Sequence, residues 1–246
     1  MKILFLGYDD CKLLSFLKSK YDVIQTDEKI KLQEVVKFDW IISFGYRYII
    51  TEDIVKYFND SIVNLHISYL PYNKGAHPNF WSFRDRTPKG VTIHQIDKGL
   101  DTGDIILQKE VIFEKEHDTL KSTYEFLIEE IQNLFIENYK SIFDKTINRY
   151  HQVGKGTFHH GKEIEKYKHL LTESWNTKIT KIMKKKLDLE IIDEIQKIRS
   201  RNNVNWMDIL RLAFKHSPDE AREIVNRINE DDGEISNLLK QLSNNG

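Results

Sequence analysis

A carboxamide and an imidazole lie two residues apart, at Asn64 and His66, where the apolar run 62–65 ends. Side chains two apart on a strand point to the same face, so both are expected on one side of a sheet. A long loop follows at 66–78, and ligands bind beyond the carboxyl ends of strands in open α/β sheets. The pair therefore predicts a polar site that faces a crevice, although a histidine capping a strand end and an asparagine in a turn would give the same pattern.

A carboxylate lies in a glycine-rich loop farther along the chain, at Asp101 within the residues GLDTGD. The loop joins two expected strands, 90–96 and 105–113, so its carboxylate can be aimed at a site as well as solvated. A carboxylate beside an imidazole holds the ring in one tautomer and favours its charged form. Asp101 is therefore the third candidate for acid–base chemistry.

The elements expected to position these residues alternate between strands and helices. Short apolar runs are typical of buried parallel strands, and spacings of three and four residues are typical of helices. The expected strands cover 2–6, 21–24, 39–44 and 62–65, and the helices between them cover 9–20, 28–38 and 52–58. This order predicts an α/β fold with a Rossmann-like, doubly wound and mostly parallel sheet.

The rest of the chain is expected to be more helical. A helical piece is predicted at 79–86, and apolar spacings of three and four predict a long amphipathic helix at 118–143. We assign residues 1–171 to one catalytic domain, with a short strand or hairpin near 148–160, and residues 172–246 to a small C-terminal helical extension. The helices expected within the extension cover 188–198, 204–216 and the residues that follow Ser217.

Composition disfavours several classes of protein. Lys and Arg number 37 against 38 Asp and Glu, a formal charge of −1, whereas proteins that bind phosphate backbones are usually basic. Nucleic acid is therefore not an expected partner. A single cysteine, Cys11, forms no intrachain disulfide and begins no zinc site, which fits a reducing cytoplasm and no metal.

No apolar run approaches the ~18 residues of a membrane span, so no membrane partner is expected. A lone Gly7 after the first strand lacks the dinucleotide-binding fingerprint.

The residues NLHISYLPYNKGAHPNFWS, at 64–82, extend this pattern. With Asp101 they resemble the motif of the formyltransferase family, which has Asn-x-His after a strand, a loop containing Leu-Pro and Gly, and an aspartate in a later turn. The family includes methionyl-tRNA formyltransferase, glycinamide ribonucleotide transformylase and the sugar N-formyltransferases. The segment looks most like the sugar N-formyltransferases, and the resemblance covers roughly residues 1–170.

The resemblance implies transfer of a formyl group from N10-formyltetrahydrofolate to the amine of a nucleotide-linked sugar, without a metal. His66 would take a proton from the attacking ammonium, because imidazole titrates near neutral pH. Asn64 would donate its amide N–H to the developing oxyanion. Asp101 would hold His66 in one tautomer, favour its charged form and help to relay the proton.

The resemblance also implies folate-binding residues, and the chemical type and position of other residues make them candidates for binding the nucleotide sugar. Those expected to bind folate are Leu70, Tyr72, Asn73, Gly75, Asp97, Gly99 and Asp104. Those expected to bind the nucleotide sugar are Arg47, Lys74, Trp81 and His160. Each group has a plainer alternative, because carboxylates also suit turns, cations suit solvent and a tryptophan suits the core.

The expected acceptor is dTDP-4-amino-4,6-dideoxyglucose, whose product would serve O-antigen synthesis for lipopolysaccharide. The alternatives are a 3-amino sugar, GDP-perosamine, a formyltetrahydrofolate hydrolase that releases formate to water, and an inactive binding module. Transfer RNA is not expected, because the related tRNA enzymes append a basic β-barrel and the C-terminal sequence here reads as helical. Related sugar enzymes suggest a homodimer. An apolar stripe in the extension would pack on its own domain or form an interface, and consists of Trp206, Ile209, Leu210 and Ala213.

Overall fold

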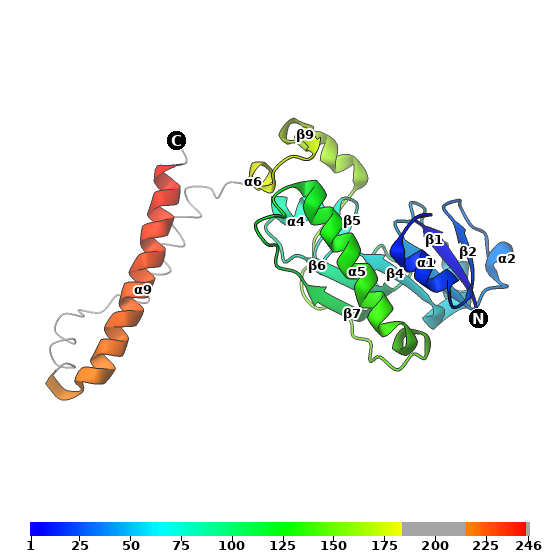
Figure 1. Ribbon diagram of the computed structural model, residues 1–246, viewed down its shortest axis with the longest axis horizontal. Helices are drawn as coiled ribbons and strands as arrows, with labels where there is room; N and C mark the ends of the chain where they lie inside the picture. The colour runs from blue at the N-terminus through cyan, green and yellow to red at the C-terminus, as the bar shows by residue number, and fades with distance from the viewer. Residues whose placement is uncertain (184–214, 245–246) are drawn as a thin grey trace. The chain divides into compact units, whose positions relative to one another are not determined.

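Six strands form one sheet in the order β2-β1-β3-β4-β6-β7 in the computed structural model, which describes residues 1–183 and 215–244 (Figure 1). The strands are β1 (Lys2–Gly7), β2 (Asp22–Thr26), β3 (Trp40–Phe44), β4 (Ile62–His66), β6 (Gly90–Gln95) and β7 (Ile105–Glu110). The first four pair in parallel, and β6 and β7 add on as antiparallel strands. The prediction of a mostly parallel α/β sheet is confirmed.

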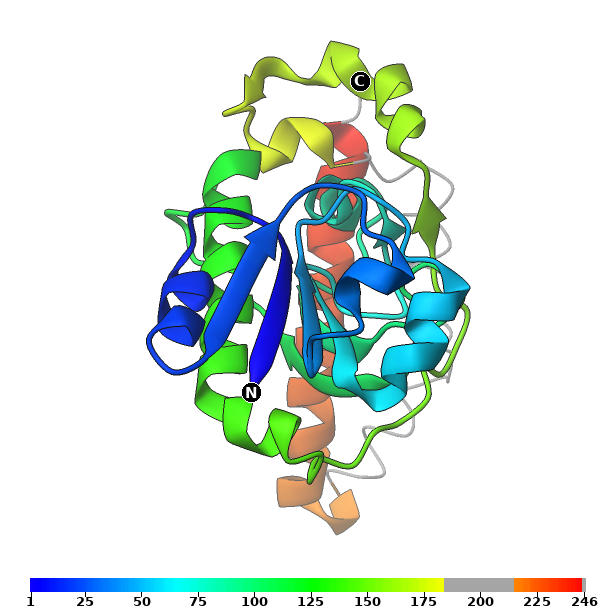
Figure 2. The same ribbon diagram turned by 90° about the vertical axis from the view of Figure 1, so that its right-hand side faces the viewer.

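Helices cover both faces of this sheet (Figure 2). They are α1 (Lys12–Lys18), α2 (Leu32–Val35), α3 (Glu52–Phe58), α4 (Pro78–Arg84) and α5 (Leu120–Phe143). One apolar cluster joins Phe5 of β1 to Leu17 of α1 and Phe135 of α5, and a second joins Leu6 of β1 to Ile54 of α3. Neighbouring residues of β1 enter opposite clusters because strand side chains alternate between faces. The sheet is therefore doubly wound.

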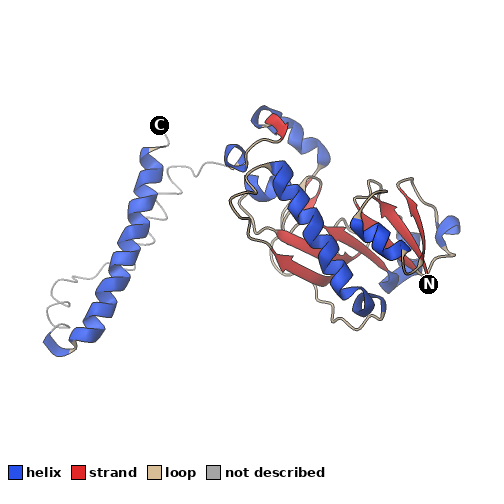
Figure 3. Ribbon diagram, viewed as in Figure 1, coloured by secondary structure: helices blue, strands red, loops and turns tan. Residues whose placement is uncertain are grey.

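Some elements are shorter than the sequence predicts. The helix expected at 28–38 is the single turn α2, and the strand expected to end at residue 113 stops at Glu110. The long helix α5 begins at Leu120, where the hydroxyl of Thr119 accepts the backbone N–H of Ser122 and thereby caps the first turn. Figure 3 shows these helices and strands in separate colours.

The chain after α5 returns to the segment that follows β4. Within 148–160, where a strand or hairpin is predicted, β8 (Phe158–His159) pairs in parallel with β5 (Lys74–Gly75), and so it does not form a hairpin. The 3₁₀ helix η2 (Gly161–Leu170), the strand β9 (Thr172–Trp175) and the helix α6 (Ile179–Ile182) follow. A third apolar cluster holds these last elements, with Ile164 and Ile182 packed against the aromatic side chains of α4.

The chain divides into two compact units, 1–184 and 185–246, whereas the sequence places the division after residue 171. Residues 172–183 join the first unit because Ile182 is fully buried there and the backbone N–H of Leu120 donates to the carbonyl of Thr177. They also contain β9, so the segment after residue 171 is not entirely helical.

The described part of the second unit is mainly one helix, α9 (Pro218–Ser243), which starts after Ser217 as predicted. The helix expected at 188–198, residues 204–214 of the next expected helix, and the Trp206 stripe lie outside the described residues. Across the described ranges, no helix has the length and apolarity that a membrane crossing requires.

Candidate active site

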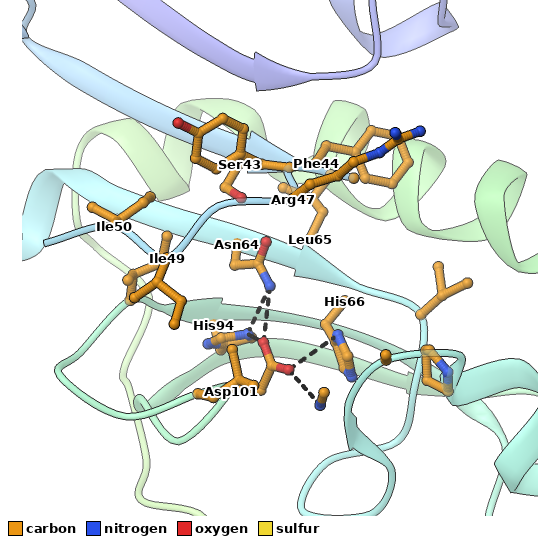
Figure 4. A pocket seen from close by; sticks show the side chains of 18 of the residues that line it. Ser43, Phe44, Arg47, Ile49, Ile50, Asn64, Leu65, His66, His94 and Asp101 are labelled. Carbon is orange, nitrogen blue, oxygen red and sulfur yellow. Dashed lines mark hydrogen bonds and ion pairs between the residues drawn. The ribbon is translucent and has the colours of Figure 1, made fainter. Parts of the chain in front are cut away.

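The central strand β4 places Asn64 and His66 on one side of the sheet. Both residues belong to β4 and both line the same cavity, as the period of two predicts (Figure 4). On the antiparallel neighbour β6, His94 is the register partner of Asn64. The carboxyl end of β4 therefore presents an amide and an imidazole, with a second imidazole beside them.

The carboxylate of Asp101 joins these groups from the loop between β6 and β7. Its Oδ1 accepts the Nδ2–H of Asn64 at 3.2 Å and lies 3.4 Å from Nε2 of His94. Its Oδ2 accepts the backbone N–H of Gly75 at 2.8 Å and lies 3.7 Å from Nδ1 of His66. Asp101 has a left-handed backbone, with φ of 53°. The three residues singled out from sequence therefore meet at one carboxylate.

Burial and charge set opposite protonation states in this group. Desolvation lowers the pKa of His66 below the ordinary value of 6.5, and the charge of Asp101 offsets only part of that effect. Burial by itself would raise the pKa of Asp101, but His66, His94 and the N–H of Gly75 outweigh it and hold this pKa well below the usual range. At neutral pH a neutral imidazole therefore faces an ionised carboxylate, which suits His66 as a proton acceptor.

A backbone carbonyl fixes the tautomer of His66. Nε2 of the ring lies 3.1 Å from the carbonyl oxygen of Asn73, which can only accept, so Nε2 carries the proton in the neutral ring. The free lone pair is then on Nδ1, the nitrogen that faces Asp101. The carbonyl of Asn73 thus fixes the tautomer that we expected Asp101 to fix, and Asp101 is placed to stabilise the ring once Nδ1 is protonated.

The amide of Asn64 is engaged on two sides. Nδ1 of His94 lies 2.8 Å from the carbonyl of Gln95, which assigns the proton of that ring to Nδ1 and leaves Nε2 as an acceptor. Nδ2 of Asn64 lies 3.2 Å from that Nε2 and 3.2 Å from Oδ1 of Asp101. Both N–H groups are therefore committed, and donation to an oxyanion requires one of them to be released.

A cavity of about 830 Å³, which we name the catalytic cavity, contains this group. It lies at the carboxyl ends of β1, β3 and β4, where open α/β sheets bind ligands. Five of the predicted binding residues line it, namely Arg47, Gly75, Asp97, Gly99 and His160. Its volume is within the range of about 300–1,000 Å³ typical of small-molecule sites.

Six predicted binding residues do not line the catalytic cavity: Leu70, Tyr72, Asn73, Lys74, Asp104 and Trp81. Leu70 and Asn73 are buried supports, since the carbonyl of Leu70 accepts the amide of Gln108 and the amide of Asn73 donates to Thr87. The carboxylate of Asp104 bonds His151 instead.

The remaining three are Trp81, Lys74 and Tyr72. Trp81 is 3% exposed and stacks on the ring of His159 with centroids 3.9 Å apart, which places it in the core. The backbone of Lys74 pairs with β8, and the carbonyl of Tyr72 accepts the hydroxyl of Ser68. Nearness to the motif in sequence therefore does not by itself put a residue in the lining of the cavity.

The sequence did not single out His94, Tyr8 or Tyr124, which also line the catalytic cavity. The hydroxyls of the two tyrosines bond each other, and burial, followed by this bond, raises the pKa of Tyr8. Tyr124 occupies one of the regularly spaced apolar positions of α5, and this spacing predicts a side chain buried in the core and not one on a cavity wall. Nothing in the local sequence marks His94, whose partner lies on a different strand.

Metal ligation has little support in the described ranges. Across residues 1–183 and 215–244, no three His, Cys, Asp or Glu side chains are grouped so that they could hold a metal ion. The polar groups of the catalytic cavity instead provide one carboxylate, two imidazoles and one carboxamide around Asp101. This set suits proton transfer and hydrogen bonding.

A family model described as formyl transferase matches residues 16–138. Among solved structures, the chain is similar to the formyltransferase PseJ from Anoxybacillus kamchatkensis, in complex with UDP-4,6-dideoxy-4-formamido-L-AltNAc and tetrahydrofolate. The identity is 48% and the TM-score 0.71, with 74% of this chain and 98% of PseJ covered.

Curated relatives share less of the sequence. The chain is 30% identical over 151 residues to a dTDP-4-amino-4,6-dideoxyglucose formyltransferase of Mycobacterium tuberculosis, covering 60% of this chain and 62% of that protein. It is 24% identical over 240 residues to a methionyl-tRNA formyltransferase of Finegoldia magna, covering 90% of this chain and 76% of that protein.

Proposed function

The chain belongs to the formyl transferase family, as a sugar N-formyltransferase, and we propose that its acceptor is a UDP-linked 4-amino-4,6-dideoxy sugar. The formyl donor is N10-formyltetrahydrofolate. The observation that carries the choice of sugar is the 48% identity to PseJ over 98% of its length, because PseJ is held in complex with a UDP-linked 4-formamido sugar. The acceptor for this chain would be the matching 4-amine.

The dTDP-linked sugar expected from sequence is the second candidate. It has support from the 30% identity to a dTDP-4-amino-4,6-dideoxyglucose formyltransferase, over 151 residues. That similarity is lower and covers 62% of the relative, whereas the similarity to PseJ covers nearly all of it. Both candidates carry the amine at C4, so they differ in the nucleoside, in both base and pentose, and in the rest of the amino sugar.

The catalytic cavity suits a formyl-folate donor. Residues 46–50 and 96–100 line it, and loop segments of this kind can offer backbone N–H and C=O groups to a flat heterocycle. Lys98, on the same wall, can pair with a carboxylate of the folate tail. These contacts support the loop after β6 as the folate side of the cavity.

The proposed chemistry assigns one role to each residue around Asp101. The neutral amine attacks the formyl carbon, and the bond from that carbon to N10 breaks. The proton lost by the amine takes the place of the formyl group on N10. Nδ1 of His66 accepts that proton, and Asp101 stabilises the resulting imidazolium. One N–H of Asn64 turns to the oxygen of the reacting carbonyl and stabilises its developing charge.

The test is a panel of acceptors incubated with purified protein and N10-formyltetrahydrofolate. The panel holds UDP- and dTDP-linked 4-amino-4,6-dideoxy sugars, a dTDP-linked 3-amino sugar and GDP-perosamine, and the readouts are free tetrahydrofolate and the formylated product. We expect the UDP-linked 4-amino sugar to give the highest kcat/KM. A higher value with a dTDP-linked acceptor would transfer the proposal to the second candidate.

Two control reactions distinguish formyl transfer to a nucleotide sugar from the alternative activities. Formate release without acceptor identifies a hydrolase, and formylation of methionyl-tRNA identifies the tRNA activity suggested by the Finegoldia relative. The variant His66→Ala should lose turnover with every acceptor, because it removes the nitrogen that is proposed to accept the proton of the amine. Turnover by His66→Ala close to wild type would contradict the proposed mechanism.

The wider setting of the activity remains a proposal. A formamido sugar on a nucleotide is an activated donor for glycosyl transfer, which fits the expected role in surface polysaccharide and O-antigen synthesis. The cytoplasmic location and the homodimer also remain predictions. Size-exclusion chromatography with light scattering on the full chain would test the dimer, with a mass near 29.3 kDa contradicting it.

A further inference from the structure

A short segment after α5, residues 149–152, is bonded to the ends of two strands of the sheet, and we name it the strap. The backbone N–H of Tyr150 donates to the carbonyl of Ile105 at 3.1 Å, and its carbonyl accepts the N–H of Ile105 at 2.9 Å. Ile105 is the first residue of β7. The guanidinium of Arg149 donates to Oε1 of Gln95, the last residue of β6, at 2.8 Å. The end of the strap therefore lies at the loop that joins these two strands.

The side chain of Gln152, at the end of the strap, bonds the backbone of that loop. Its Nε2 donates to the carbonyl of Asp101 at 2.8 Å and to the carbonyl of Gly103 at 2.9 Å. Both partners are carbonyl oxygens, which only accept, so the NH₂ end of the amide must face the loop. One amide group therefore spans the turn that carries the carboxylate of the active site.

The backbone of Asp101 requires support of this kind. Its φ of 53° is left-handed, which is unfavourable for a residue with a Cβ and persists only where the surrounding structure fixes it. The N–H of Gly75 and the amide of Asn64 hold the carboxylate of Asp101 (Figure 4). Those bonds act on the side chain, whereas the bonds from Gln152 act on the backbone. The two sets together determine where the carboxylate lies.

The oxygen of the Gln152 amide has no comparable role. It is buried, and among the residues that the structure describes it accepts no hydrogen bond. A buried acceptor without a partner is unfavourable for stability. The amide is therefore poorly explained as a contact that serves stability alone, and its contribution is the pair of bonds that it donates to the loop.

We propose that Gln152 is a positioning residue of the active site, which holds the turn of Asp101 so that the carboxylate stays beside Nδ1 of His66. Gln152 does not line the catalytic cavity, so it acts on the reaction only through Asp101. The inference rests on the proposed function, in which Asp101 stabilises the imidazolium of His66. A residue 51 positions after Asp101 in the chain thereby contributes to the rate.

The first test is Gln152→Leu in the full chain, which removes both donated bonds and nearly keeps the size of the side chain. We expect kcat to fall by up to about 100-fold, because small displacements of catalytic groups cost that much. The fall of kcat/KM at acidic pH should move to lower pH, because a displaced carboxylate raises the pKa of His66 less. An unchanged kcat, or a fall of kcat/KM at the same or a higher pH than in wild type, overturns the inference.

A double-variant cycle tests whether Gln152 acts through Asp101. Gln152→Leu should lower kcat by a much smaller factor in the Asp101→Asn background than in wild type, because residues that act through one another are not additive. Single-turnover rates of the four proteins give both factors. Equal factors in the two backgrounds would assign an independent role to Gln152 and overturn the inference.

The matched control is Gln132→Leu. Gln132 is a buried glutamine of α5 that also makes two hydrogen bonds, because it donates to the carbonyl of Ile128 and accepts the backbone N–H of Leu13. Its replacement should lower the urea midpoint but leave kcat and the pH dependence of kcat/KM unchanged. If Gln132→Leu moves the pH dependence as far as Gln152→Leu does, the shift reflects a general loosening of the fold and the inference is overturned.

An NMR titration of His66 in the free protein separates this inference from the proposed function, since it needs no substrate. The signal of His66 is identified by its absence from the His66→Ala variant. If no acceptor is formylated but Gln152→Leu lowers the pKa of His66, the proposed function fails and the positioning by Gln152 stands. If Gln152→Leu leaves that pKa unchanged or raises it, the inference is overturned whatever the enzyme formylates.

Discussion

The backbone N–H of Gly75 donates to Oδ2 of Asp101 at 2.8 Å. This bond joins the loop after β4 to the loop between β6 and β7, so the carboxylate is held by a residue far from it in sequence. Gly75 has φ of 86°, and a Cβ there would lie 2.4 Å from the carbonyl oxygen of His159. The pairing of β5 with β8 therefore controls where the carboxylate points.

Gly75→Ala should impair both folding and catalysis. The left-handed backbone costs a residue with a Cβ about 1–3 kcal/mol, and the contact with His159 adds to this cost. The N–H that holds Asp101 must then move. We expect a lower midpoint in urea and a lower kcat.

Gly154→Ala is the matched control for that variant. Gly154 has a similar φ of 97°, but an added Cβ would meet nothing within 4 Å. It should cost about 1–2 kcal/mol through its backbone and leave kcat unchanged. Equal effects of the two variants on kcat would show that the bond from Gly75 to Asp101 does not matter for turnover.

The fall of kcat/KM at acidic pH, which we call the acid limb of the pH–rate profile, should reflect protonation of His66. Its pKa is lowered from 6.5 by burial, so kcat/KM should remain level as pH falls to 6.5 and decline only below it. The free energy of unfolding should also fall as the pH is lowered below 6.5. In that interval the unfolded chain binds a proton at this histidine that the folded chain does not, so stability increases with pH. A pH series of initial rates and of urea midpoints measures both, and a rate midpoint above 6.5 would contradict the assignment.

Asp101→Asn should lower the rate and move the acid limb. The carboxylate partly offsets the effect of burial on His66, so its removal should lower the pKa of His66 further and displace the limb to lower pH. The loss of imidazolium stabilisation should reduce kcat by less than the roughly 10,000-fold seen where the carboxylate also fixes the tautomer, because the carbonyl of Asn73 fixes the tautomer here. An unmoved limb would show that the two groups do not interact.

Asn64→Ala should reduce kcat by about 100- to 1,000-fold with little change in either KM, because an oxyanion donor acts only in the transition state. Single-turnover measurements isolate the chemical step. A rise in KM with kcat preserved would instead assign Asn64 to substrate binding.

His94→Ala should test whether the second imidazole positions Asn64 and Asp101. Small displacements of catalytic groups cost up to about 100-fold in rate, and a loss of this order in kcat is expected. His94→Gln should restore part of it, because its carbonyl can accept the N–H of Asn64. If His94→Ala and His94→Gln have the same kcat, or if His94→Ala has the kcat of the wild type, His94 is not a positioning residue.

The alternation of side chains along a strand was sufficient to place residues that are close in sequence and belong to the same strand. Asn64 and His66 lie on one face because strand side chains repeat every two residues, and the buried strands follow from short apolar runs. The assignment of Leu70 and Asn73 to folate came from the family resemblance, and in the structure both are buried outside the lining of the catalytic cavity. Nearness in sequence does not tell which side of a loop faces the ligand.

The α/β sheet, the residues Asn64, His66 and Asp101, and the family they resemble could all be predicted from the order of amino acids alone. Only the tertiary structure placed His94 beside Asn64, through the antiparallel pairing of β6 with β4. Only the tertiary structure also placed Gln152 against the backbone of Asp101. The physical reason is that hydrophobic periodicity sets each element and its buried face, whereas strand order and loop contacts depend on packing between residues far apart in the chain.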